Sequence, residues 1–210
     1  MLELQRASIA TSERKLFGPL SFVIEPGEIL GLQAPSGSGK SVLLRWMLGA
    51  LPDGLSAEGE LNLNGERITQ LATEQRSIGL LLQQATLFPH LSVSGNLLFA
   101  MPPERDRSQR IAQMLKQAGL DGLEARDPAT LSGGQQARVA MLRALAAQPK
   151  ALLLDEPFSS LDSRLRGEFR AWVFEQIEQR QIPALVVSHD IEDLQQCGRV
   201  VTLDGEQVDV

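Results

Sequence analysis

The feature that most constrains the fold of this chain is the eight-residue stretch APSGSGKS, at positions 34–41. An apolar run at 29–33 precedes it, and a helical pattern of apolar residues at 41–51 follows it. We therefore expect a buried strand, a glycine-rich turn and a helix in direct succession. Such a succession is typical of folds that layer helices on a sheet.

The turn has most of the residues of a phosphate-binding loop. In the pattern G-x-x-x-x-G-K-[ST], Gly39, Lys40 and Ser41 match, but Ala34 occupies the first position. Backbone N–H groups in such a turn, ahead of a helix N-terminus, form a cradle for an anion. Lys40 would place a charge on the phosphates, and Ser41 would offer a hydroxyl to Mg²⁺. An ordinary Ser/Gly linker, the alternative, does not require Gly-Lys-Ser between an apolar strand and an apolar helix.

The effect of Ala34 depends on its backbone conformation. Alanine costs on the order of 1 kcal/mol at positive φ, because of its Cβ, and almost nothing at negative φ.

The rest of the chain alternates between strand and helix patterns. Further strand candidates are 22–24, 78–82, 151–155 and 184–188, with a hairpin at Asn64-Gly65 and a closing hairpin of 200–203 and 206–210 around Asp204-Gly205. Helical patterns cover 105–118, 133–147, 163–180 and 190–196. This alternation predicts an α/β fold with a parallel sheet, interrupted by a helical block from about residue 93 to 148.

Length and composition limit the number of domains, the kinds of partner and the cellular compartment that the chain suits. A length of 210 residues suits one domain, or one domain with an inserted lobe. The net charge of -6 disfavours bulk attraction to nucleic acid or anionic lipid, although a local basic patch is possible. Cys197 is the only cysteine, which fits a reducing compartment. The start, MLELQRASIA, lacks the apolar core of a secretory signal, and no apolar run approaches the roughly 20 residues of a membrane span.

Two acidic residues follow the apolar run ALLL at 151–154. Asp155 and Glu156 would emerge at the carboxyl end of a central strand, where ligand sites of such sheets lie. One carboxylate there can hold Mg²⁺ through water, and the other can orient or deprotonate an attacking water. A polar strand end that simply faces solvent is the alternative.

A second helix start, LSGGQ at 131–135, has a similar chemistry. Ser132 is a good N-cap, and the two glycines leave the first N–H groups of the helix open. The segment is either a capped helix and nothing more, or a second helix terminus directed at a phosphate.

LSGGQ followed by LLLDEP, with a phosphate loop upstream, resembles the ABC (ATP-binding cassette) ATPase family over nearly the whole chain. The resemblance implies a P-loop NTPase (RecA-like) core with an N-terminal antiparallel β region and an inserted helical subdomain. The whole of 1–210 would be a single ABC ATPase domain, with the core at about 1–83 and 150–210 and the helical subdomain at about 84–149.

The resemblance also assigns roles to residues. Gln83 in LLLQQ matches the Q-loop glutamine, Asp162 in SSLD matches the D-loop, and His189 in VVSHD matches the switch histidine that senses the γ-phosphate. Catalytic residues would be Glu156, His189 and Gln83, and Mg²⁺ would be held by Ser41, Gln83 and Asp155. Nucleotide contacts would come from Ala34, Pro35, Ser36, Gly37, Ser38, Gly39, Lys40, Ser41, Val42, Ser132, Gly133, Gly134, Gln135 and Asp162.

By resemblance, two copies sandwich two ATP molecules, so that Ser132 and Gly134 of one copy meet the γ-phosphate held by Lys40 of the other. The segment LFPHLSV, which includes His90, would face a membrane partner. The aromatic residue that stacks on adenine in the family is absent, because Thr11 occupies its expected position and the chain has no tyrosine. Phe17 is a possible substitute.

These features lead us to expect the ATPase subunit of a bacterial ABC importer. Its partners would be a second copy of itself, integral membrane permease subunits and, indirectly, a solute-binding protein, at the cytoplasmic face of the inner membrane. Three alternatives remain: the motor of an export or lipoprotein-extraction system, a non-transport ABC protein acting on DNA or ribosomes, and a catalytically weakened cassette. Ala34 motivates the last, whereas Glu156 and His189 argue against it.

Overall fold

The computed structural model describes residues 1–35, 37–84, 86–203 and 205–208. One group of strands comprises β1 (Leu2–Thr11), β2 (Lys15–Ile24), β4 (Leu55–Leu63) and β5 (Glu66–Arg67). A second group comprises β3 (Ile29–Gln33), β6 (Ile78–Leu81), β7 (Ala151–Asp155), β8 (Ala184–Ser188), β9 (Arg199–Thr202) and β10 (Gln207–Val208). The helices are α1 (Lys40–Leu48), α2 (Val93–Ala100), α3 (Arg107–Gln117), α4 (Gly133–Ala146), α5 (Ser163–Gln179) and α6 (Ile191–Leu194), with 3₁₀ turns at Thr73–Gln75 and Pro128–Thr130.

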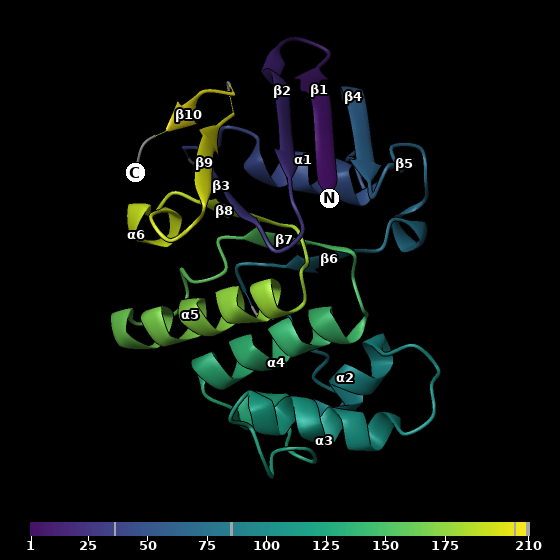
Figure 1. Cartoon of the computed structure of the whole chain (residues 1–210), viewed down its shortest axis with the longest axis vertical. Coiled ribbons are helices and arrows are strands. Elements are labelled where there is room, and N and C mark those ends of the chain that lie inside the picture. The colour runs from purple at the N-terminus through teal and green to yellow at the C-terminus, as the bar shows by residue number, and fades with distance from the viewer. Residues whose placement is uncertain (36, 85, 204, 209–210) are drawn as a thin grey trace.

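The strands form two sheets of different kinds (Figure 1). The first is antiparallel, with the order β2-β1-β4-β5. The second has the order β10-β9-β3-β8-β7-β6, and its strands run parallel except at β10. The predicted α/β class, with a parallel sheet and an N-terminal antiparallel region, is confirmed.

The central strands of the second sheet are covered on both faces. In β7, Ala151 and Leu153 face a core formed with α1 and the antiparallel sheet, whereas Leu152 and Leu154 face a core formed with α4 and α5. Side chains alternate across a strand, so a strand covered on both faces must be apolar throughout. This explains the uninterrupted run ALLL.

A third core joins α2, α3 and α4, which Figure 1 shows beyond α5 from the sheet. Leu97, Leu115 and Val139 are fully buried there, one from each helix. Met141 of α4 belongs instead to the core under the sheet. Helix α4 therefore packs on both sides, and it connects the helices of this region to the parallel sheet.

Several boundaries differ from the sequence prediction. Helix α1 begins at Lys40 and ends at Leu48, not at 51, because Gly49 adopts φ 82° and its N–H closes the last turn. The Asn64-Gly65 hairpin is confirmed, and both residues have positive φ as a two-residue turn of this kind requires. Strand β6 ends at Leu81, so Leu82, predicted within the buried strand, is exposed.

Strand β1 has no counterpart in the sequence prediction. Arg6 has φ 49°, and the pairing of β1 with both neighbours shifts register around it. Such a bulge breaks the alternation by which a strand is recognised in sequence. Among the residues described, no helix is both long enough and apolar enough to cross a membrane.

Candidate functional site

The glycine-rich turn connects the centre of the parallel sheet to α1. Strand β3 lies between β8 and β9, and the chain leaves its carboxyl end directly into the turn. Gly37 and Gly39 have φ of 78° and 102°, which L side chains rarely adopt, and Gly39 is the N-cap of α1. The Ser38 hydroxyl donates to the Pro35 carbonyl at 2.7 Å. Ser36 lies outside the described residues.

Ala34 does not disturb this turn. It is not among the non-glycine residues with positive φ, and its side chain is buried in the core formed with α1. Its carbonyl accepts a hydrogen bond from Lys40 Nζ at 2.9 Å. Alanine therefore meets the backbone requirement at this position without strain.

Glu156 lies at the centre of a buried polar cluster beside the turn and contacts the other members of that cluster. Its Oε1 lies 2.9 Å from Lys40 Nζ and 2.8 Å from His189 Nδ1. The residue has φ 48°, and its N–H donates to the Val187 carbonyl at 2.9 Å, which fixes the carboxylate at the ends of β7 and β8. Burial raises the pKa of Glu156, but the hydrogen bonds from His189 and Lys40 outweigh it and hold that pKa below its usual value. The carboxylate is thus ionised at neutral pH.

Asp155 and Ser41 form the neighbouring pair. The Ser41 hydroxyl donates to Asp155 Oδ2 at 3.2 Å. Burial, together with the adjacent Glu156 charge, raises the pKa of Asp155, and the hydrogen bond from Ser41 opposes the rise. A hydroxyl and a carboxylate so close together are oxygen donors of the kind that Mg²⁺ prefers, and a bound cation would favour the ionised carboxylate.

In the described part of the chain, no side-chain hydrogen bond joins the remaining predicted residues to this cluster. Gln83 is exposed in the bend after β6. Ser132 caps α4, its hydroxyl accepting from Gln135 N–H at 3.3 Å, while the Gln135 side chain accepts from Ser132 N–H at 3.0 Å. Asp162 caps α5 by accepting from Leu165 N–H at 3.0 Å.

The two glycines of LSGGQ differ in surroundings. A Cβ on Gly133 would meet open space, whereas one on Gly134 would lie 3.6 Å from the Leu165 side chain. Figure 1 places α4 in the helical half of the molecule and α1 beneath the antiparallel sheet. Within one chain, the second helix terminus is therefore formed but lies away from the phosphate loop.

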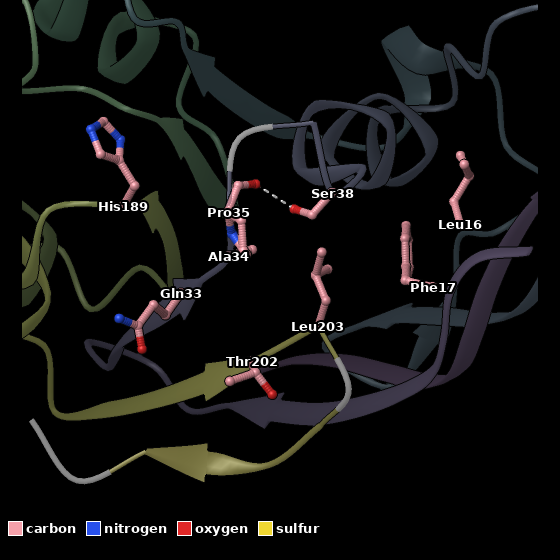
Figure 2. A pocket seen from close by; sticks show the side chains of 9 residues that line it. All are labelled: Leu16, Phe17, Gln33, Ala34, Pro35, Ser38, His189, Thr202 and Leu203. Atoms are coloured by element: carbon pink, nitrogen blue, oxygen red, sulfur yellow. Dashed lines mark hydrogen bonds between the residues drawn. The ribbon is translucent and has the colours of Figure 1, made fainter.

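Two cavities flank the turn. The larger, about 550 Å³, lies between the turn and the ends of β3 and β9 (Figure 2), and is lined by Leu16, Phe17, Gln33, Ala34, Pro35, Ser38, His189, Thr202 and Leu203. The smaller, about 240 Å³, is lined by Leu16, Gly37, Gly39, Lys40, Ser41 and Val42. Sequence reasoning missed Leu16, Thr202 and Leu203, because only the pairing of distant strands brings them to the loop.

Phe17, the possible substitute for the missing base-stacking aromatic, is largely buried. Phe17 is 5% exposed and packs beneath the turn, where a Cβ on Gly39 would lie 3.0 Å from its ring. The Thr11 hydroxyl accepts hydrogen bonds from the N–H groups of Glu13 and Arg14 and so closes the β1–β2 turn. Of the side chains beside Lys40 in the smaller cavity, Leu16 and Val42 are the aliphatic ones that a base could contact.

A phosphate loop after β3, a histidine after the neighbouring β8 and an ionised glutamate after β7, paired with that histidine, define a nucleotide-hydrolysing cassette. Comparison with known proteins agrees. The chain belongs to the ABC transporter family, whose family model matches residues 17–159. It is an ATP-binding subunit of the ATPase class.

Individual relatives extend this similarity over almost the whole chain. It is 49% identical over 197 residues to the uncharacterized ABC transporter ATP-binding protein YnjD of Escherichia coli (strain K12), covering 92% of this chain and 91% of YnjD. It is 33% identical to the sulfate/thiosulfate import ATP-binding protein CysA of Halalkalibacterium halodurans, covering 98% of this chain but 59% of CysA. The chain therefore spans nearly all of YnjD and little more than half of that CysA protein.

Among solved structures, the dimeric ATP-binding cassette MJ0796, in a post-hydrolysis state bound to ADP and Pi, matches all of this chain. The TM-score is 0.79 at 31% identity, and the match covers 97% of the MJ0796 chain.

Proposed function

We propose that this protein hydrolyses ATP as the nucleotide-binding subunit of a bacterial ABC importer for a small solute. One observation carries the proposal: the Glu156 carboxylate is held by Lys40 and His189 at the strand ends beside the phosphate loop. The curated relatives named for sulfate/thiosulfate import support the direction of transport.

The cluster provides the chemistry for in-line attack of water on the γ-phosphorus. The backbone N–H groups of the loop and the Lys40 ammonium would hold the phosphates, and Lys40 would exchange its contact with Glu156 for them. Glu156, ionised and released from Lys40, would orient the attacking water and accept its proton, while His189 would contact the γ-phosphate. Mg²⁺, when bound, would neutralise phosphate charge, and Ser41, Asp155 and Gln83 are the residues we assign to it.

Completion of the site requires a second copy of the chain. Helix α4, which Ser132 caps, and helix α5, which Asp162 caps, lie on the other side of the parallel sheet from α1 and its phosphate loop (Figure 1). A two-fold dimer would place each LSGGQ helix start opposite the partner's loop, so both sites form together. The dimeric MJ0796 cassette supports this arrangement.

An apolar surface next to Gln83 suits a membrane permease. Leu82, Leu98 and Phe99 are 45%, 41% and 70% exposed, and the last two are adjacent on α2. Phe99 packs edge-on against Phe88, and Phe88 also contacts the His90 ring. We assign permease docking to this surface, at the cytoplasmic face of the membrane, with a solute-binding protein outside.

We also propose that residues of about 84–149 act as one helical subdomain of a single domain. The core formed by α2, α3 and α4 is distinct from the two cores that cover the sheet, and α4, Leu87 and Trp172 connect it to one of them. Closure of the dimer would reach the permease through this subdomain, since it carries both the LSGGQ helix and most of the apolar surface. Because Ala34 fits without strain, it gives no reason to prefer a weakened cassette.

Complementation between two inactive variants tests the shared site. Lys40→Ala removes the loop charge, and Ser132→Arg blocks the LSGGQ helix start. Each variant alone should hydrolyse ATP at least a hundredfold more slowly than the wild type. An equimolar mixture should recover roughly a quarter of the wild-type rate, because half of the dimers are mixed and each has one intact site. A mixture as inactive as its components would contradict a site shared between copies.

A further inference from the structure

Behind the cluster of Lys40, Glu156 and His189 lies a second polar group that the proposed chemistry does not use. Ser188, the last residue of β8, is fully buried. Its hydroxyl lies 3.4 Å from Glu156 Oε2 and 3.2 Å from Asp193 Oδ2, and it accepts the Asp190 N–H at 3.0 Å. A hydroxyl has a single proton, so Ser188 can donate to only one of these two carboxylates at a time, and it separates two groups that would otherwise repel each other.

The second carboxylate is tied to α5. Asp193 is 1% exposed and pairs with Arg170 Nη1 at 2.7 Å, where Arg170 is itself 8% exposed. One turn earlier on α5, Arg166 pairs with Asp190, the residue that follows His189. Two arginines on one face of α5 therefore hold the segment that carries both Ser188 and His189.

This arrangement restrains both sides of the catalytic carboxylate. Glu156 Oε1 faces Lys40 and His189, and its Oε2 faces Ser188. If Lys40 turns to the nucleotide phosphates, the Ser188 hydroxyl and His189 remain as the side chains that fix the carboxylate plane. In a buried site, an oriented partner of this kind determines where a general base points.

We propose that Ser188, Asp193 and Arg170 are positioning residues for Glu156 and His189, so that α5 sets the geometry of ATP hydrolysis. The inference rests on the proposed ATPase function. Asp162, which we assign to the nucleotide site shared between copies, is the N-cap of α5, so this helix also connects the shared site to Glu156. A purely structural role for the same residues would change stability without separating kcat from KM.

Two substitutions of Ser188 test the proposal. Ser188→Ala removes the hydroxyl with little change of volume and should lower kcat about tenfold, with the KM for ATP within twofold of the wild type. Ser188→Thr keeps the hydroxyl and should retain kcat within about twofold. Asp193→Asn should lower kcat in the same way. The matched control is Arg164→Met, which removes an exposed arginine of α5 and should change neither constant.

A double-mutant cycle asks whether Ser188 acts through Glu156. Adding Ser188→Ala to Glu156→Gln should leave the residual rate unchanged within about twofold, because the residue that Ser188 positions is already lost. MgATP-dependent dimerisation of Ser188→Ala should persist, which would show that nucleotide binding is intact.

The outcomes are distinguishable. A wild-type kcat for Ser188→Ala, or equal loss in the Ala and Thr variants, would overturn the positioning role and leave the proposed ATPase standing. Absence of ATP turnover by the wild-type chain, with its permease present, would overturn the proposed function and the inference with it.

Discussion

Ala34 shows that a motif position can change without loss of the backbone it encodes. The family pattern has glycine there, but the structure gives Ala34 no positive φ and packs its Cβ in the core. Its carbonyl, which any residue would supply, receives the Lys40 ammonium. The requirement for glycine falls instead on Gly37 and Gly39, which have positive φ.

Replacement of Ala34 by glycine should therefore not improve nucleotide binding. We expect the Kd of Ala34→Gly for MgATP to stay within about threefold of the wild type, and the free energy of unfolding to fall by about 0.5–1 kcal/mol, because glycine adds freedom to the unfolded chain. Nucleotide titration and urea unfolding measure the two quantities. Tenfold tighter binding would show that alanine distorts the loop.

Cys197 is partly buried, and its thiol should react only slowly in the folded protein. Burial raises the pKa of its thiol to about 12, and the nearby Asp193 charge adds to the rise. Since the thiolate is the reactive form, alkylation at pH 8 should be about a thousandfold slower than in the urea-unfolded chain. The folded rate should still rise tenfold per pH unit up to pH 10, where the unfolded rate has levelled off. Mass spectrometry reports on this single cysteine directly, and equal rates in both states would contradict its burial.

At the scale of elements, α1 is anchored at the end opposite the phosphate loop. Arg76 is 5% exposed and donates hydrogen bonds to the carbonyls of Trp46 and Met47, in the last turn of the helix, at 2.8 and 3.0 Å. Its other donors reach the carbonyls of Thr69 and Leu71. A cation at this position donates to carbonyls of the last turn, of which that of Trp46 also accepts the Gly49 N–H, and it complements the negative end of the helix dipole.

Loss of this anchor should cost about 3 kcal/mol of unfolding free energy in Arg76→Met, because several buried carbonyls lose their donor. The control Arg67→Met removes an exposed arginine paired with Glu60 at 3.1 Å and should cost less than about 1 kcal/mol. Urea unfolding of both variants gives the comparison. A similar cost for the two would show that Arg76 does not anchor α1.

The exposed apolar surface of α2 gives a prediction about the permease. Phe99→Asp places a charge where we expect an apolar contact, and it should weaken co-purification with co-expressed permease subunits at least tenfold. Gln113→Asp puts the same charge on an exposed position of α3 and should leave co-purification unchanged. Equal recovery of permease with both variants would remove the basis for assigning docking to this surface.

Local sequence patterns predicted the helices and strands that carry the site residues. The contacts between side chains far apart in the sequence were seen only in the folded structure. Strand β3, the glycine-rich turn and α1 are determined by residues close together in the sequence, so the sequence predicted these three elements in the correct order. Lys40 and Glu156 could both be assigned because parallel strands present their carboxyl ends at one edge. The Ser188–Asp193–Arg170 contacts could not be predicted, since they depend on how α5 and α6 pack. Strand β1 was missed because the bulge at Arg6 removes its alternation.

At the scale of the whole molecule, the predicted site residues lie in two separate parts of the folded chain. The phosphate loop, Glu156 and His189 lie at the carboxyl edge of the parallel sheet, whereas Ser132 starts a helix packed on the third core. Each part is preorganised by contacts within its own half. Turnover should therefore depend on nucleotide-driven association, and the ATPase rate per chain should rise with protein concentration until dimers predominate.

The most direct test of this account is the mass of Glu156→Gln in solution, by light scattering, with and without MgATP. The substitution removes the carboxylate that we assign to the attacking water while keeping an oxygen for Lys40 and His189, so ATP should be bound but not hydrolysed. We predict the 22.9 kDa of one chain without nucleotide and twice that mass with MgATP. A mass of one chain at millimolar MgATP would contradict the central claim that two copies complete the site.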